Sequence, residues 1–216
     1  QYFSSSLRTL MHGDSLAAKS LEGQLVKLAK STPFSLVEVQ DATKQLMAYG
    51  FVAGDITKNI RMLGDVASGL KIPFSDIAYL YGTLKTQGVA HSKDIYQFTN
   101  RGINLVPELA KQFKIAEKDV MKFVESGKVG FKDIEKAFKS MTSEGGMFFG
   151  MMEEQSKTVG GQISNIGDAW TQVQVEIGKS QSGIIAGTLK FVNEFVSELQ
   201  VAFTQSNKMD DAMKRF

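Results

Sequence analysis

The sequence contains no cysteine, and this absence excludes two kinds of chemistry at once. A chain without thiols has neither a disulfide framework nor a thiolate metal site. Histidine is scarce as well, because His12 and His91 are the only two in the chain. Neither belongs to a metal-ligand spacing such as His-Glu-x-x-His, so we expect no metal ion and no cofactor.

The chain also lacks a surplus of charge of either sign. Its 25 basic residues are offset by 23 acidic ones, which leaves a net charge of +2. Proteins that bind nucleic acids normally cluster basic residues on one face, and the sequence shows no such cluster. No run of lysine and arginine is long enough to indicate a membrane-surface patch. We therefore expect no direct nucleic-acid binding.

Long apolar runs are the third absence. The best candidate, residues 184–203, is interrupted by Lys190, Glu194 and Glu198, whereas a membrane-spanning helix needs about 18 or more apolar residues in succession. Neither a membrane span nor a signal peptide is expected. Because the chain begins with Gln1 and not with methionine, we expect it to be a piece of a longer protein.

Apolar residues do recur at helical spacing along most of the chain. One stripe repeats at intervals of four and three residues, and it consists of Ile56, Ile60, Leu63, Ala67 and Leu70. Such a stripe occupies one face of an α-helix. Alternating stretches long enough for strands are absent from the sequence. We therefore predict an all-α fold, a compact multi-helix domain of short capped helices flanked by longer helices at both ends.

Capping residues place the ends of these helices. Ser35 followed by Glu38 has the spacing of a capping box, Ser75 and Ser92 resemble further N-caps, and Pro107 suits a first helical turn. Six glycines lie where apolar stripes end, as left-handed C-caps would, namely Gly50, Gly69, Gly88, Gly102, Gly127 and Gly130. The predicted helices lie near 35–49, 55–69, 75–87, 92–101, 107–114, 117–126 and 131–143.

Three regions are expected along the chain. Residues 1–30 are predicted to form a long N-terminal helix, residues 31–145 a compact helical domain, and residues 146–216 long C-terminal helices. These C-terminal helices are expected to pack on the N-terminal helix and to extend away from the compact domain as a stalk. The tripeptide Pro-Phe-Ser begins at Pro33 and recurs 40 residues later at Pro73. We interpret this recurrence as two similar helix starts and not as a solenoid, because no convincing third copy follows.

Candidate catalytic groups are few, and each has a simpler explanation. His91 lies near Ser92 and Asp94 in sequence, but neighbouring residues at one helix start do not readily converge on a substrate as a triad does. The carboxylate pairs Glu153-Glu154 and Asp210-Asp211 point about 100° apart on a helix, whereas glycosidases need two carboxylates facing one cleft. We predict no catalytic, cofactor-binding or metal-binding residues, and no enzymatic activity.

Two further features have alternative interpretations. The pairs Gly145-Gly146 and Gly160-Gly161 lack the Gly-Lys-Ser/Thr and the preceding strand of a phosphate loop, so breaks between helices explain them better. Residues 147–152 contain two phenylalanines and three methionines. This cluster belongs either to the core or to an assembly surface, because methionine-rich faces adapt to partners.

Four segments resemble the N-terminal region of phage tail tape measure proteins. They agree with that family in order and spacing over residues 31–178. The segments are Ser31–Ser35 with Ala42–Leu46 and Tyr49–Phe51; Arg61–Leu70; Tyr81-Gly82 with Lys85, Gly88 and Arg101–Ile103; and Thr142–Phe148 with Gln155-Ser156, Gly160–Gln162 and Ile163–Asn165. No family segment is recognised after Gly183.

The resemblance implies a mostly helical structural protein that occupies the lumen of a growing tail tube and sets its length. It further implies tail tube and tail-assembly proteins as partners, and a location in the host bacterial cytoplasm during assembly and then in the virion tail. Apart from the resemblance, self-association through the helices is expected. The piece itself is expected to be a folded module at or near one end of the ruler. Two alternatives stay open at this point, a helical interaction scaffold of another system and a cell-wall hydrolase.

Overall fold

The computed structural model describes residues 2–158. In this part of the chain the secondary structure is helical, apart from one isolated antiparallel bridge between Val89 and Gly130. The predicted all-α fold is confirmed. The helices are α1 (Tyr2–Leu10), α2 (Ser15–Lys30), α3 (Leu36–Ala48), α4 (Ala53–Leu70), α5 (Phe74–Gln87), α6 (Ser92–Thr99), α7 (Val106–Phe113), α8 (Glu117–Glu125), α9 (Phe131–Thr142) and α10 (Met151–Ser156).

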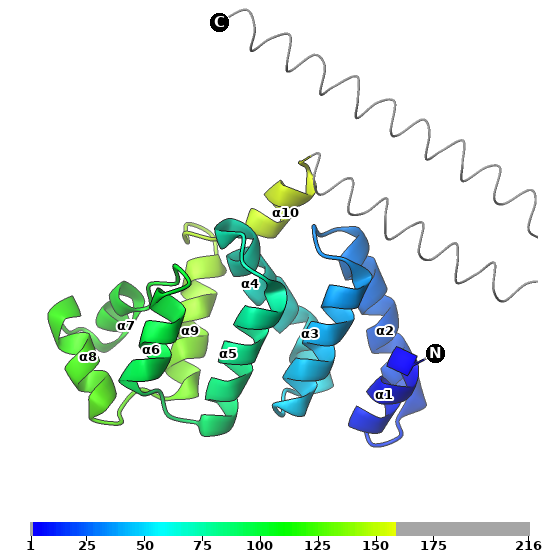
Figure 1. Cartoon of the computed structure of the whole chain (residues 1–216), viewed down its shortest axis with the longest axis horizontal. Coiled ribbons are helices and arrows are strands. Elements are labelled where there is room, and N and C mark those ends of the chain that lie inside the picture. The colour runs from blue at the N-terminus through cyan, green and yellow to red at the C-terminus, as the bar shows by residue number, and fades with distance from the viewer. Residues whose placement is uncertain (1, 159–216) are drawn as a thin grey trace, which may run out of the picture.

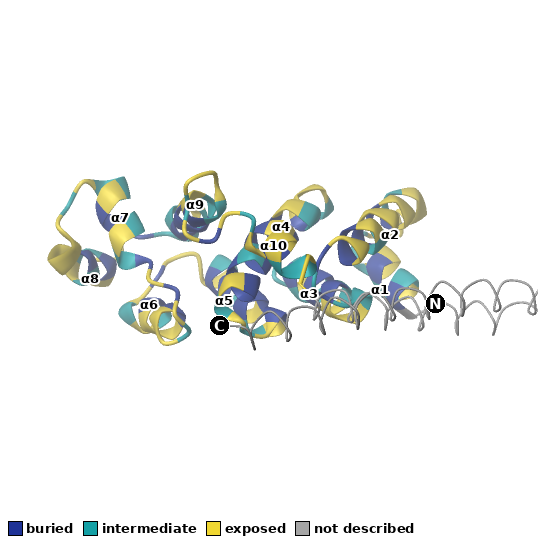
Figure 2. Cartoon of the chain, turned by 90° about the horizontal axis from the view of Figure 1, so that it is seen from above, coloured by how far each residue is buried: buried dark blue, intermediate teal, exposed yellow. Residues whose placement is uncertain are grey.

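The helices stand side by side in two rows, with α1 at one end and α8 at the other (Figure 1). Seen from above, α1, α3, α5 and α6 form one row, and α2, α4, α9 and α7 form the second (Figure 2). Neighbours within a row pack on one another, as α3 does on α5 and α4 on α9. Helix α10 lies across the end of α4.

The space between the rows is filled by one continuous apolar core. This core extends along the chain from Phe3 to Met152 within the described residues. Leu25, Leu63 and Phe138 are among the side chains with no measurable exposure to solvent, and each such residue contributes roughly 1.5–3 kcal/mol by its burial. Helices as short as these are marginal alone, so their stability depends on this shared core.

Two of the three predicted serine caps differ from expectation. Ser35 forms its capping box, because its Oγ accepts from Glu38 N at 3.2 Å and Glu38 Oε2 accepts from Ser35 N at 2.8 Å. The prediction for Ser75 was wrong, since α5 already begins at Phe74. The Phe74 ring is buried and stacks on Phe34 with 4.8 Å between ring centroids, which outweighs the roughly 1 kcal/mol of a serine cap.

The predicted cap at Ser92 was wrong by one residue. His91 is the N-cap of α6, and its backbone N–H donates to Asp94 Oδ2 at 2.8 Å. The hydroxyl of Ser92 donates instead to Glu125 Oε1 at 3.2 Å, on helix α8. Pro107 lies in the first turn of α7, as predicted.

Four of the six glycines predicted to end helices have positive φ, namely Gly50, Gly88, Gly102 and Gly127. The other two predictions were wrong. Gly69 lies inside α4, which ends with Lys71 in the left-handed region at φ 54°. Gly130 is the N-cap of α9. Because α4 continues past Gly69, this glycine has a packing function, described below.

The prediction of one long helix over residues 1–30 was also wrong. The chain reverses between α1 and α2, where His12 and Gly13 adopt φ of 55° and 88°. Asp14 then caps α2 by accepting from Ala17 N at 2.9 Å. Two short helices can pack their apolar faces against each other, whereas the two halves of one straight helix cannot. The division of the chain into three regions stays a prediction, and the expected C-terminal helices beyond residue 158 lie outside the described residues.

Candidate functional site at the junction of α4 and α10

The two histidines lie apart from any common site. His12 is exposed in the turn between α1 and α2, and His91 is exposed at the start of α6. Asp94, which the sequence places near His91, accepts hydrogen bonds from His91 N and from Gln87 Nε2. The carboxylate therefore caps the helix and fixes the preceding loop.

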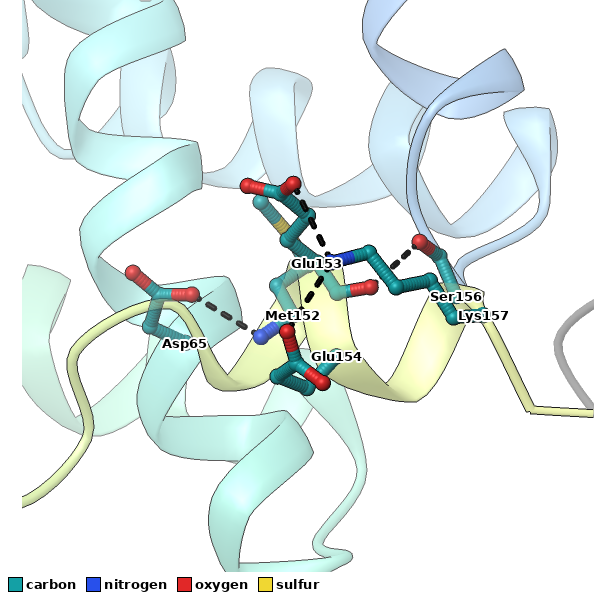
Figure 3. Close-up of polar contacts among 6 residues, drawn as sticks. All are labelled: Asp65, Met152, Glu153, Glu154, Ser156 and Lys157. Atoms are coloured by element: carbon teal, nitrogen blue, oxygen red, sulfur yellow. Dashed lines mark hydrogen bonds and ion pairs between the residues drawn. The ribbon is translucent and has the colours of Figure 1, made fainter.

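The neighbouring carboxylates Glu153 and Glu154 lie on the exposed side of α10. Both pair with Lys157, at 3.5 Å and 2.9 Å between the charged atoms (Figure 3). These contacts raise the pKa of Lys157, the hydrogen bond to Glu154 contributing most. The pair acts as a solvated helix face. The second pair, Asp210-Asp211, lies outside the described residues.

The turn at Gly145-Gly146 uses its own backbone amides internally. Gly146 N donates to Ser143 O at 2.7 Å, and Phe148 N donates to Met141 O at 2.8 Å. These N–H groups are thereby unavailable to a phosphate. The second pair, Gly160-Gly161, lies outside the described residues. Among residues 2–158 no group of three or more His, Asp or Glu side chains could hold a metal ion.

The most distinctive contact between distant segments joins α4 to residues 148–152. Two glycines of α4 allow this close approach. A Cβ at Gly64 would lie 2.6 Å from Met152 Sδ, and one at Gly69 would lie 2.8 Å from Phe148 Cδ1. Side chains at either position would push the segment away, so the absence of a Cβ on α4 is what admits it.

Asp65 lies between these two glycines and fixes the start of α10. Its Oδ1 accepts a hydrogen bond from Met152 N at 2.9 Å, across 87 positions of sequence (Figure 3). The local N-cap, Gly150, has no side chain and a φ of 68°. A carboxylate from another helix therefore satisfies an amide that a local serine or aspartate would otherwise cap.

Burial raises the pKa of Asp65 above its ordinary value of 3.8. The hydrogen bonds from the backbone of Met152 and Gly150 act in the opposite direction, as does the charge of Arg61, but burial outweighs them. The junction therefore contains a carboxylate whose charge is costly and whose acceptor oxygen holds α10 in place.

Residues 147–152 divide between core and surface. Phe148 and Met152 are 3% and 5% exposed and belong to the core, which confirms the core interpretation for these two. Met147, Phe149 and Met151 are exposed by 69%, 55% and 38%. The assembly-surface interpretation stays a prediction for these three, which we call the 147–151 patch.

A second cluster joins α5 to α9 through the third resembling segment. The ring of Tyr81 packs on Phe51, Phe131 and Phe138 with centroid distances from 5.0 to 5.6 Å. Lys85 Nζ lies 4.9 Å from the centroid of Phe51, within cation–π range. Burial raises the pKa of Tyr81, whose hydroxyl has no hydrogen-bond partner. This cluster stabilises the contact between the rows.

The structure thus brings together segments that the sequence only places in order. Arg61–Leu70 contributes Gly64, Asp65 and Gly69 to the junction, and the segment Thr142–Phe148 leads into it. A comparison with known protein families matches residues 1–179 to the family described as tape measure protein. The chain belongs to the tape measure protein family. This is a family of structural phage proteins.

A curated relative supports the membership. The sequence is 26% identical over 201 residues to the Mu-like prophage FluMu protein gp42 of Haemophilus influenzae. The alignment covers 89% of this tape measure family chain and 29% of that relative, so the chain spans less than a third of the curated protein it matches. No solved structure matches the chain. None of the helices between residues 2 and 158 is long and apolar enough to cross a membrane.

Sequence reasoning missed the tape measure chain's α4–α10 junction. Asp65 was not singled out, and Gly69 was assigned to a helix end. One signal was available, because Gly64 and Gly69 lie within the stretch spanned by the apolar stripe from Ile56 to Leu70. Glycine inside a helix costs about 1 kcal/mol relative to alanine, which indicates a packing reason for its presence.

Proposed function

We propose that this chain is a folded assembly module of a phage or prophage tail tape measure protein, acting in tail length determination and tail tube assembly. The family match over residues 1–179 carries the proposal. The all-helical fold agrees with it. Tail tube and tail-assembly proteins are the proposed partners, the host cytoplasm is the proposed place of assembly, and the virion tail is the final location.

The shape of the described part supports a more specific proposal for its role. The longest described helix, α4, has 18 residues and spans about 27 Å, whereas residues 2–158 in one continuous helix would span about 240 Å. Because the helices pack side by side, this module is too short to act as the ruler. We propose that it organises assembly while an extended part of the same protein measures length.

In-frame deletions in the phage gene test this division. Removing about 100 residues from an extended helical region outside this module should shorten the tail by about 150 Å, since a helix rises 1.5 Å per residue. Removing residues 2–158 should abolish tail formation without producing uniformly shortened tails. Electron microscopy of the tails measures both. Tails of unchanged length after the first deletion would contradict the proposal and favour a scaffold of another kind.

We also propose that the module acts without catalysis. Support comes from the structural character of the family and from the internal use of the candidate polar groups, such as Asp94 in a helix cap. Release of fragments from purified peptidoglycan by the isolated chain would overturn this proposal. A lytic domain in another part of the full protein would not affect this test, because the assay uses the isolated chain.

A further inference from the structure

The 147–151 patch is an apolar surface that lies next to core residues. Phe148 and Met152 of the same segment are buried in the core, whereas Met147, Phe149 and Met151 are exposed to solvent. Three large apolar side chains exposed within five positions are uncommon without a partner surface. Methionine suits such a surface because its side chain adapts to what covers it.

The chain itself offers a matching apolar stripe a few residues further on. Residues 163–177 contain five large apolar residues at intervals of three and four, and these are Ile163, Ile166, Trp170, Val173 and Ile177. This spacing places them on one face if the segment is helical. The same segment contains no lysine or arginine.

We infer that residues 163–177 fold back and cover the 147–151 patch of the same chain. The distance is within reach. Helix α10 has six residues and spans about 9 Å, and the four residues 159–162 can extend over about 14 Å. Gly160 and Gly161 lie in this connection and permit a reversal of the chain.

Proximity favours this occupant over a second copy of the chain. A short flexible connection gives an effective concentration in the millimolar range. A second copy at micromolar concentration competes with a disadvantage of roughly a thousandfold. This inference does not depend on the proposed function.

Trp170 allows a direct test, because it is the only tryptophan in the chain. In the 216-residue protein we expect its fluorescence emission to be shifted to shorter wavelength than that of free tryptophan amide, and to be protected from iodide. The double variant Met147→Ser/Phe149→Ser should lose both properties. A matched control is Leu16→Ser, which replaces a residue that is 84% exposed on α2 and should change neither.

Two further measurements keep the test decisive. Ile166→Ser changes the stripe without touching the described core, so it should also expose Trp170 while the melting temperature of the core stays the same. The emission should not vary with protein concentration. An exposed Trp170 in the unmodified protein, a protected Trp170 in the patch variant, or protection that appears only on dimerisation by analytical ultracentrifugation would each overturn the inference.

Discussion

At the scale of single residues, the junction depends on a carboxylate that serves as an acceptor more than as a charge. Asp65 Oδ1 accepts from Met152 N, while burial raises the pKa of the same side chain above 3.8. The folded protein therefore holds a proton on Asp65 more readily than the unfolded chain does. The contribution of this group to stability is greatest below pH 3.8 and is lost as the pH rises through the higher folded pKa.

Substitution of Asp65 should separate these two effects. Asp65→Asn keeps an acceptor oxygen without the charge, so we expect it to be at least as stable as the unmodified protein at pH 7. Its advantage should shrink as the pH is lowered toward 3.8. Asp65→Ala removes the acceptor and should cost about 0.5–2 kcal/mol near pH 4. This cost should become smaller toward pH 7, because the unmodified protein then carries the unfavourable buried charge of Asp65. Urea unfolding between pH 4 and 7 measures both, and equal losses in the two variants would contradict this account.

A second prediction at this scale compares a glycine of α2 with a glycine of α4. An alanine at Gly23, inside α2 with nothing within 4 Å of its Cβ, should stabilise the protein by about 0.5–1 kcal/mol through helix propensity. The same change at Gly69 meets the ring of Phe148 at 2.8 Å and should remove that gain through overpacking. The difference in the free energy of unfolding is therefore expected to be about 1 kcal/mol or more. Equal gains would show that the junction tolerates a Cβ.

At the scale of helices, two nearly identical helix starts behave differently. The tripeptide at Pro33 leads to a cap on Ser35, and the tripeptide at Pro73 leads to a helix that begins at Phe74. The two phenylalanine rings stack on one another, so the recurrence places equivalent helices, α3 and α5, side by side. The local sequence therefore predicts a serine cap at both positions, and the packing of the phenylalanine determines whether the cap forms.

Alanine substitution at the two serines measures this difference. Ser35→Ala removes the hydroxyl that accepts from Glu38 N and should cost about 0.5–2 kcal/mol. Ser75→Ala changes an exposed residue within the first turn of α5 and should stay within about 0.5 kcal/mol of the unmodified protein. Thermal or urea unfolding provides the comparison. A loss at Ser75 as large as that at Ser35 would show that both serines act as caps.

At the scale of the whole molecule, the described residues share one core. It extends from Phe3 to Met152 and crosses both rows of helices. Phe138 on α9 is fully buried in this core, and its ring centroid lies 5.2 Å from that of Tyr81 and 5.4 Å from that of Phe98. We therefore expect the helices to unfold together and not in separate groups.

Phe138→Ala tests this cooperativity. The change should cost about 3–5 kcal/mol. If the core is one unit, hydrogen exchange should accelerate to the same degree at Leu25 on α2 as at residues of α9. The control is Tyr96→Ala on α6, where the side chain is 55% exposed and the effect should remain within about 0.5 kcal/mol. Faster exchange confined to α6–α9 would instead show two independent parts.

The sequence by itself determined the all-α class, the position of most helices between α3 and α9, and the family. The apolar stripe from Ile56 to Leu70 predicts α4, because an amphipathic helix must hide its apolar face from water. The spacing that reveals this face depends only on neighbours in sequence. The positive φ of Gly50 and Gly88 follows from the same local logic. The family resemblance likewise required only the order of short segments.

Only the tertiary structure decided where the N-terminal helix breaks and which distant residues Gly69 and Asp65 contact. The N-terminal helix breaks at His12 and Gly13 because two short helices bury more apolar surface than one straight helix. Gly69 packs against Phe148 and Met151 from beyond the end of α9, and Asp65 caps a helix 87 positions away. The sequence holds these residues but not their partners, since a contact between distant segments exists only after the intervening helices have packed.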